Sequence, residues 1–171
     1  MAEWPGQSRI GFLRDMSNPI IYAIPDLSIN RLIEVLSSDD DYGPMIVDKT
    51  LIVTRASDIK SIPKNISKAI VVIPVGLEPT EQRRGQVALT EAIAVVAQVR
   101  NSSDQLVGKA SMDEAGKLLG ICLKALLGWT PDPLAYSPLE MVPSPAPEFE
   151  AGFGYYPIAF ETQYILSGAN Q

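Results

Sequence analysis

The 171 residues of this chain include no histidine, which excludes several common kinds of catalytic and metal-binding site. Histidine is the usual general base near neutral pH and the commonest metal ligand in proteins. Its absence also excludes the Ser-His and Cys-His pairs in which a neighbouring base activates a nucleophile. The single cysteine, Cys122, lies among Leu119, Ile121 and Leu123, where a small buried apolar side chain is expected. We therefore predict a structural thiol at this position.

Carboxylates are the remaining side chains that could bind a metal ion or transfer a proton. Asp39, Asp40 and Asp41 are adjacent in a segment rich in turn-forming residues. Such a segment could be a metal site, a negatively charged patch that repels nucleic acid, or a solvated loop. Three adjacent carboxylates point in different directions, and no distant acidic cluster matches them. We favour the solvated loop.

Glu91 and Glu161 are the acidic residues that a small hydrolase or ligand-binding domain would use. Glu91 lies on the apolar face of a predicted strand, so it could act as a buried acid only if a second polar group approached it. The sequence names no such partner, and we expect Glu91 near a sheet edge or a subunit contact. Metal-ligand spacing, a phosphate-binding loop and a nucleophile elbow are all missing. We predict no catalytic residue, no metal site and no cofactor, and hence no enzyme.

Length and charge limit the class of protein and its partners. A chain of 18.5 kDa suits one domain with a substantial core. Its net charge of −6 opposes a broad electrostatic grip on DNA. The sequence has no apolar run of the length that spans a membrane, roughly 18 residues or more, and residues 1–15 lack the apolar middle of a signal peptide. We expect a cytoplasmic protein without membrane contact.

Two helices are predicted, after an N-terminal arm formed by residues 1–25. In the first helix, residues 27–37, apolar positions recur at helical spacing and Asp26 or Ser28 supplies the N-cap. The second helix starts at the capping-box pattern Ser111-Met112-Asp113-Glu114 and ends before Gly128. Residues 26–171 are expected to form a single domain.

Strands are predicted from runs of β-branched residues and from alternation of apolar and polar residues. Residues 76–80 are expected to form a turn, and Pro74 is expected at a sheet edge or a strand end. In residues 86–100 the odd positions other than Glu91 form an apolar face and the even positions a smaller, more polar one, which favours a strand, although Ala88 to Ala97 alone also fits a helix. The predicted strands are residues 45–47, 51–54, 69–75, 86–100, 139–142 and 155–166. Because strands cluster instead of alternating with helices, we predict an α+β fold with a mostly antiparallel sheet and two main helices packed on it.

An ordered series of short motifs runs through this part of the chain. It starts at Gln82-Arg83 and passes through Val95-Val96-Ala97-Gln98-Val99-Arg100-Asn101. A polar loop and a helix ending in Ala125-Leu126-Leu127-Gly128-Trp129-Thr130-Pro131 follow, and then Phe160-Glu161-Thr162-Gln163-Tyr164. In order and spacing, from about Leu51 to Leu166, these motifs resemble the tail terminator proteins of long-tailed bacteriophages. The proline-rich stretch and the arm that contains Trp4 depart from the pattern of that family.

The resemblance implies a tail-terminator-like fold and a structural role in the virion. Members of this family form a six-membered ring on the last ring of tail tube subunits, at the tail-neck junction. Such a hexameric homo-oligomer ends tube polymerisation and offers a surface to neck or head-closure proteins, while DNA only passes through its lumen. Assembly would take place in the host cytoplasm. The alternative within the virion is a head-closure or connector protein.

Ring formation requires arms, loops and sheet edges that reach a neighbouring subunit. The arm, the polar loop 101–109 and the proline-rich residues 131–147 are candidates, although each could equally be a solvated connector. Arg83 and Arg84 could pair with acidic groups of the tube or of a neighbour. Near the end of the chain we expect an aromatic cluster of Trp129, Phe149, Phe153, Tyr155 and Tyr156. The candidate interface residues are Arg83, Arg84, Asn101, Asp104, Lys109, Trp129, Phe153 and Tyr155.

Overall fold

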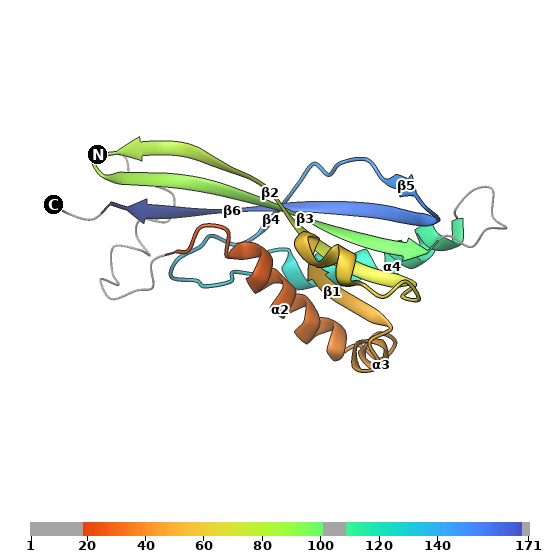
Figure 1. The fold of residues 1–171 in the computed structure, drawn as a ribbon. Coiled ribbons are helices and arrows are strands. Elements are labelled where there is room, and N and C mark those ends of the chain that lie inside the picture. The colour runs from red at the N-terminus through yellow and green to blue at the C-terminus, as the bar shows by residue number, and fades with distance from the viewer. Residues whose placement is uncertain (1–18, 101–108, 169–171) are drawn as a thin grey trace.

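The computed structural model of the protein describes residues 19–100 and 109–168. Helices and strands are not segregated into separate parts of the chain, because α4 divides the strands (Figure 1). In chain order the elements are α2 (Ile24–Ser37), α3 (Gly43–Val47), β1 (Leu51–Arg55), the 3-10 helix η1 (Ala56–Ser61), β2 (Lys68–Arg83), β3 (Gln86–Arg100), α4 (Lys109–Leu126), β4 (Glu140–Val142), β5 (Glu148–Glu150) and β6 (Phe153–Ser167).

All these strands belong to one sheet, in the order β1-β2-β3-β6-β4. Only the β1–β2 pair is parallel, and the other pairs are antiparallel. β5 also pairs with β6, so β4 and β5 follow one another along the same outer side of that strand. The predicted α+β class with a mostly antiparallel sheet is confirmed.

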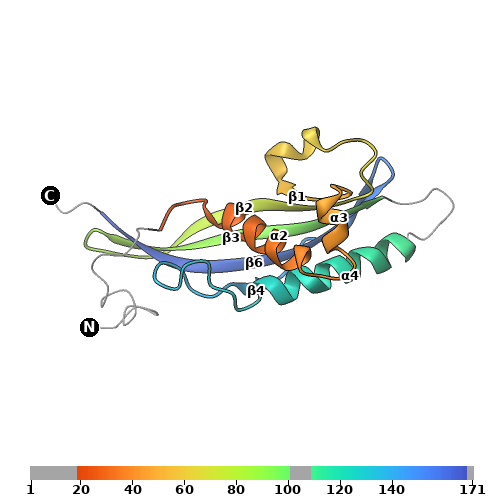
Figure 2. The same cartoon turned by 90° about the horizontal axis from the view of Figure 1, so that it is seen from below.

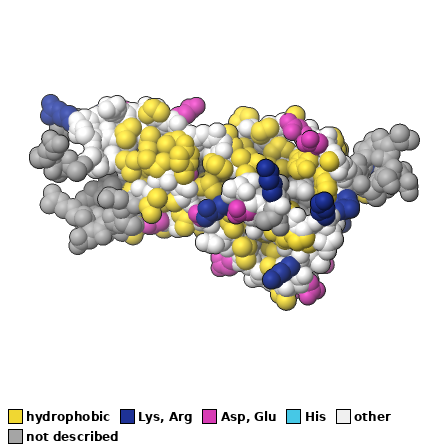
Figure 3. Space-filling view, in the orientation of Figure 1, with side chains coloured by type: hydrophobic (Ala, Val, Ile, Leu, Met, Phe, Trp, Pro, Cys, Tyr) yellow, Lys and Arg dark blue, Asp and Glu magenta, His cyan; other side chains and the backbone are white. Residues whose placement is uncertain are grey.

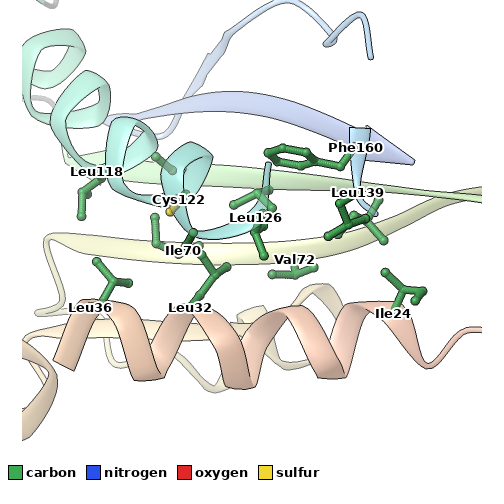
Figure 4. Packing of buried hydrophobic residues seen from close by; sticks show 14 of the residues in the cluster. Ile24, Leu32, Leu36, Ile70, Val72, Leu118, Cys122, Leu126, Leu139 and Phe160 are labelled. Carbon is green, nitrogen blue, oxygen red and sulfur yellow. The ribbon is translucent and has the colours of Figure 1, made fainter. Parts of the chain in front are cut away.

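The helices α2 and α4 cover one face of the sheet and lie side by side on it (Figures 1 and 2). The apolar stripe of each helix points towards β2, β3 and β6, and Cys122 of α4 is buried among these residues (Figure 4). Fully buried side chains of this core include Ile24, Leu32, Leu36, Ile70, Leu118, Leu126, Leu139 and Phe160.

The alternation predicted for residues 86–100 is confirmed in β3. Alternate side chains of this strand enter two separate hydrophobic clusters, one on each face of the sheet. Side chains at its odd positions, such as Ile93 and Val95, enter the core beneath the helices. At even positions, Ala94 and Val96 join Val71 in a smaller cluster on the opposite face. Ala56 of η1 packs against this second cluster, so η1 covers part of the face that α2 and α4 leave open.

β2 continues through residues 76–80, so the turn predicted there is wrong. The strand stays paired with β3 as far as Arg83, because two register shifts, between Pro74 and Gly76 and between Pro79 and Glu81, accommodate the irregular residues. β1 pairs with β2 only as far as Val72. Beyond that point β2 has no outer strand partner in the described chain, which agrees with the edge position expected for Pro74.

Three further predictions near helix ends are wrong. Residues 45–47 belong to α3, whose first turn contains Pro44, instead of to a strand. α2 starts at Ile24 with Ala23 as its N-cap residue and no side-chain cap, so Asp26 lies inside the first turn. α4 starts at Lys109, which places Ser111 within the helix; its hydroxyl lies 2.9 Å from the hydroxyl of Tyr156.

The predicted end of α4 and the predicted last strands are confirmed. Gly128 has a φ of +74°, the left-handed conformation that ends many helices. β4 and β6 lie where strands were predicted, and β6 starts two residues earlier, at Phe153. The short strand β5 was not predicted, because three residues that follow a run of prolines carry no alternation pattern.

Candidate interaction surfaces

The tip of the β2–β3 hairpin carries two of the candidate interface residues. Arg83 ends β2 and forms an ion pair with Glu81. Arg84 and Gly85 form the turn, where both have positive φ values, +23° and +81°. Arg84 is exposed, and no described residue forms an ion pair with it. The tip therefore presents a free guanidinium group at the end of a long hairpin.

The polar loop before α4 lies mostly outside the described residues. This applies to Asn101 and Asp104, two of the candidate interface residues. Lys109, the third candidate of this loop, is the first residue of α4 and is exposed. The structure thus places only the last of the three.

The aromatic residues expected to form one cluster are divided between the two faces of the sheet. Trp129 packs against the core beneath the helices, whereas Tyr155 packs against the smaller cluster on the opposite face. The ring of Phe153 lies 5.2 Å from the guanidinium carbon of Arg100, and the rings of Phe149 and Tyr156 meet edge to face at 5.8 Å. The single cluster is wrong, because successive side chains of β6 point to opposite faces.

Glu91 is fully buried in β3, which lies between β2 and β6. The sheet edge expected for this residue is therefore wrong. One carboxylate oxygen accepts a hydrogen bond from the hydroxyl of Tyr164 at 2.8 Å and another from the backbone N–H of Tyr22 at 3.2 Å. The other oxygen, Oε1, has no hydrogen-bond partner in the described chain. Burial raises the pKa of Glu91, although these hydrogen bonds lower it.

Tyr136 extends this polar cluster towards the segment that precedes α2. Its hydroxyl accepts a hydrogen bond from the backbone N–H of Ile20 at 2.9 Å and donates one to the carbonyl oxygen of Ile20 at 3.1 Å. Its ring meets that of Tyr164 edge to face at 5.1 Å. Glu91 thus binds the backbone N–H of Tyr22, and Tyr136 binds backbone groups of Ile20, so that both hold this segment on the sheet.

This arrangement does not bring Glu91 and Glu161 together. Thr162 is the residue of β6 that pairs with Glu91, so the neighbouring Glu161 points to the opposite face. The sequence alone did not link Tyr164 of β6 to Glu91. A signal existed, since a buried carboxylate needs a hydrogen-bond donor and Tyr164 is an apolar-face residue with a polar tip.

The acidic loop before α3 is stabilised by its own side chain. The carboxylate of Asp39 accepts hydrogen bonds from the backbone N–H groups of Asp41 and Tyr42, at 2.9 and 3.1 Å. A shallow hollow beside it is lined partly by Asp39, Asp40 and Asp48. Within residues 19–100 and 109–168, no group of three or more metal-ligating side chains is found. The carboxylate of Asp39 thus has a structural function as a turn-stabilising acceptor.

None of the described helices combines the length and apolar character needed to cross a membrane.

No curated protein matches the sequence significantly. The sequence does match the model of one protein family, described as phage tail terminator protein, over residues 52–171. The match extends from β1 to the end of the chain and so includes the complete β2–β3 hairpin, α4 and β6. The protein therefore belongs to the phage tail terminator family and is a structural component of the bacteriophage tail.

Proposed function

We propose that this protein caps the tail tube as a ring, ends tube polymerisation and provides the surface for head-tail joining. The observation that carries the proposal is the match to the terminator family over most of the chain. In this role the protein binds copies of itself, the tail tube protein below and a neck or head-closure protein above. Its station is the tail-neck junction of the virion.

The fold supports a ring because its sheet has two different outer edges. β1 forms one edge, and β4 and β5 form the other. A ring of identical subunits needs two unlike surfaces per subunit, one of which contacts the preceding copy and the other the following copy. Six subunits would close such a ring, and the acidic net charge of −6 suits a lumen through which DNA passes without being held.

The proposal is tested with the purified protein and the tail tube protein of the same phage. Analytical ultracentrifugation should find a discrete oligomer, and added oligomer should stop the growth of tubes seen by electron microscopy. Gold labels on this subunit should mark the head-proximal end of the tube. A protein that stays monomeric at every concentration and leaves tube length unchanged would contradict the proposal. Labels found on the head side of the neck would favour a head-closure or connector protein.

A further inference from the structure

The two outer edges of the sheet carry opposite charges. Residues 49–68, which include β1, η1 and the start of β2, contain five basic residues and one acidic residue. The chain after Lys124, which includes β4, β5 and β6, contains five acidic residues and neither Lys nor Arg. Folding thus places a basic segment along one edge and an acidic segment along the other.

Only part of this charge is neutralised within the described subunit. Arg55 pairs with Asp26, and the ammonium group of Lys68 lies 2.7 Å from the carboxylate of Glu114. The three other cations of the basic edge are exposed and form no ion pair with a described residue: Lys49, Lys60 and Lys64. On the acidic edge, Glu148 and Glu150 of β5 are likewise exposed and have no cationic partner among the residues described.

The register of the sheet puts Lys64 at the same end of the sheet as the two free carboxylates of β5. One transverse row of paired residues crosses the sheet from edge to edge: Leu51, Lys68, Val99, Gly154 and Phe149. Lys64 precedes the start of β2 in this row, and Glu148 and Glu150 flank Phe149 at the other end. Lys49, Lys64 and the free carboxylates of β5 therefore lie near one level of the sheet, separated by its width, while Lys60 lies in η1, which follows the other end of β1.

Apolar surface accompanies the charges on the acidic edge. Phe149 is 57% exposed between its two glutamates, although its ring already contacts Tyr156. Figure 3 shows acidic side chains along the upper margin, over β5, and a group of basic side chains below them, over η1 and the β1 side of the sheet. Aromatic residues, Phe included, are enriched in the cores of protein interfaces, which a polar rim surrounds.

We propose that β5 of one copy docks against the β1–η1 edge of the next copy. Glu148 and Glu150 pair there with Lys60 and Lys64, and Phe149 becomes buried between the two pairs. The proposal rests on the ring proposed above and identifies the surfaces that would build it. A symmetric contact between two β5 strands is disfavoured, because it would bring carboxylates against carboxylates. The unlike edges favour a head-to-tail contact, which can repeat until a ring closes.

Charge reversal on each edge tests this contact. Variant A carries Glu148→Lys and Glu150→Lys, and variant B carries Lys60→Glu and Lys64→Glu. Either variant alone faces like charges across every contact, and we expect its self-association to weaken by at least about tenfold in sedimentation velocity. In an equimolar mixture every A–B contact again joins opposite charges. The mixture should therefore restore an oligomer in which the two variants alternate.

The matched control carries Asp40→Lys and Asp41→Lys, two exposed carboxylates of the acidic loop before α3. It changes the net charge as variant A does and should assemble like the wild type. If wild-type rings form and variants A and B assemble equally well, the proposed contact is wrong while the ring itself stands. If each variant fails alone and the mixture fails too, the charge pairing is also wrong. A wild-type protein that never assembles would overturn both the contact and the proposed function.

Discussion

The hydroxyl of Tyr164 in β6 donates a 2.8 Å hydrogen bond to the carboxylate of Glu91 in β3, and both side chains are buried. This contact ties the two central strands of the sheet to the segment before α2, because the same carboxylate oxygen accepts the backbone N–H of Tyr22. Burial and the bond to Glu91 raise the pKa of Tyr164, so its phenol remains a donor at any ordinary pH.

Tyr164→Phe should destabilise the protein, because it removes a donor from a buried acid that already has one unpaired oxygen. The expected loss is roughly 1.5–3 kcal/mol, the range for hydrogen bonds to charged groups. Urea unfolding monitored by circular dichroism measures it. Tyr155→Phe, on the other face of the sheet, is the control and should change stability much less. Equal effects of the two substitutions would show that the contact with Glu91 contributes little.

The stability of the protein should depend on pH through Glu91. Its pKa is raised in the folded state by burial, so the folded protein binds this proton more tightly than the unfolded chain does. The resulting stabilisation is fully present below the unfolded pKa and is lost as pH rises through the folded pKa. Relative to Glu91→Gln, the wild type should therefore lose free energy of unfolding over that interval. Urea titrations at a series of pH values test this, and a constant difference would contradict it.

The opposite pH dependence is expected for Glu114. Burial would raise its pKa, but hydrogen bonds from Lys68 and Tyr42 outweigh burial and lower it. Stabilisation by Glu114 should thus be present above the unfolded pKa and be lost as pH falls through the folded pKa. Glu114→Gln should cost about 1 kcal/mol near neutral pH and less in acid. A double-mutant cycle that combines Glu114→Gln with Lys68→Met should give a coupling energy between the two side chains. Additive losses of stability in the double variant would contradict the ion pair.

Two glycines should respond in opposite directions to alanine. A Cβ atom on Gly43 would lie 2.6 Å from the backbone oxygen of Ser37, whereas nothing lies within 4 Å of one on Gly120 in α4. Gly43→Ala should therefore destabilise the protein by about 1–3 kcal/mol, and Gly120→Ala should stabilise it by about 0.5–1 kcal/mol. Thermal unfolding of the two variants compares them directly. A neutral Gly43→Ala would mean that α3 shifts away from Ser37.

Cys122 should react with thiol reagents only after unfolding. Burial raises the pKa of its thiol to about 12, so almost no reactive thiolate exists near neutral pH. Labelling by a colourless disulfide reagent such as dithionitrobenzoate should be slow in buffer and fast in denaturing urea. Fast labelling of the folded protein would show that α4 opens from the sheet.

Elements with a strong local pattern were the ones that the sequence could predict. The strand at residues 86–100 was found with its exact bounds, because its odd side chains enter one core and its even side chains face another environment. The strand predicted for residues 45–47 was wrong, because a short apolar run fits either a helix or a strand. In the folded protein these residues form part of α3. The turn predicted for residues 76–80 was wrong, because β2 accommodates these turn-forming residues at two irregularities in its register and continues as a strand.

Contacts between distant parts of the chain lay beyond sequence analysis. Glu91 and Tyr164 are separated by 73 positions, and only the register of β3 and β6 brings them together. The opposed charges of the two sheet edges were equally hidden, because strand order decides which segments become edges. The candidate residues Arg84 and Lys109 are exposed as an interface requires, whereas their participation in one stays a prediction.

The outer half of β2 affects how readily separate copies of the protein aggregate. Beyond Val72 this strand has a free edge in the described chain, and a free edge can recruit further strands and grow into insoluble fibrils. Pro74 and Pro79 remove two backbone donors from that edge, and the register shifts beside them interrupt its regular spacing. Both features oppose the pairing of this edge with strands of other chains, and hence open-ended aggregation.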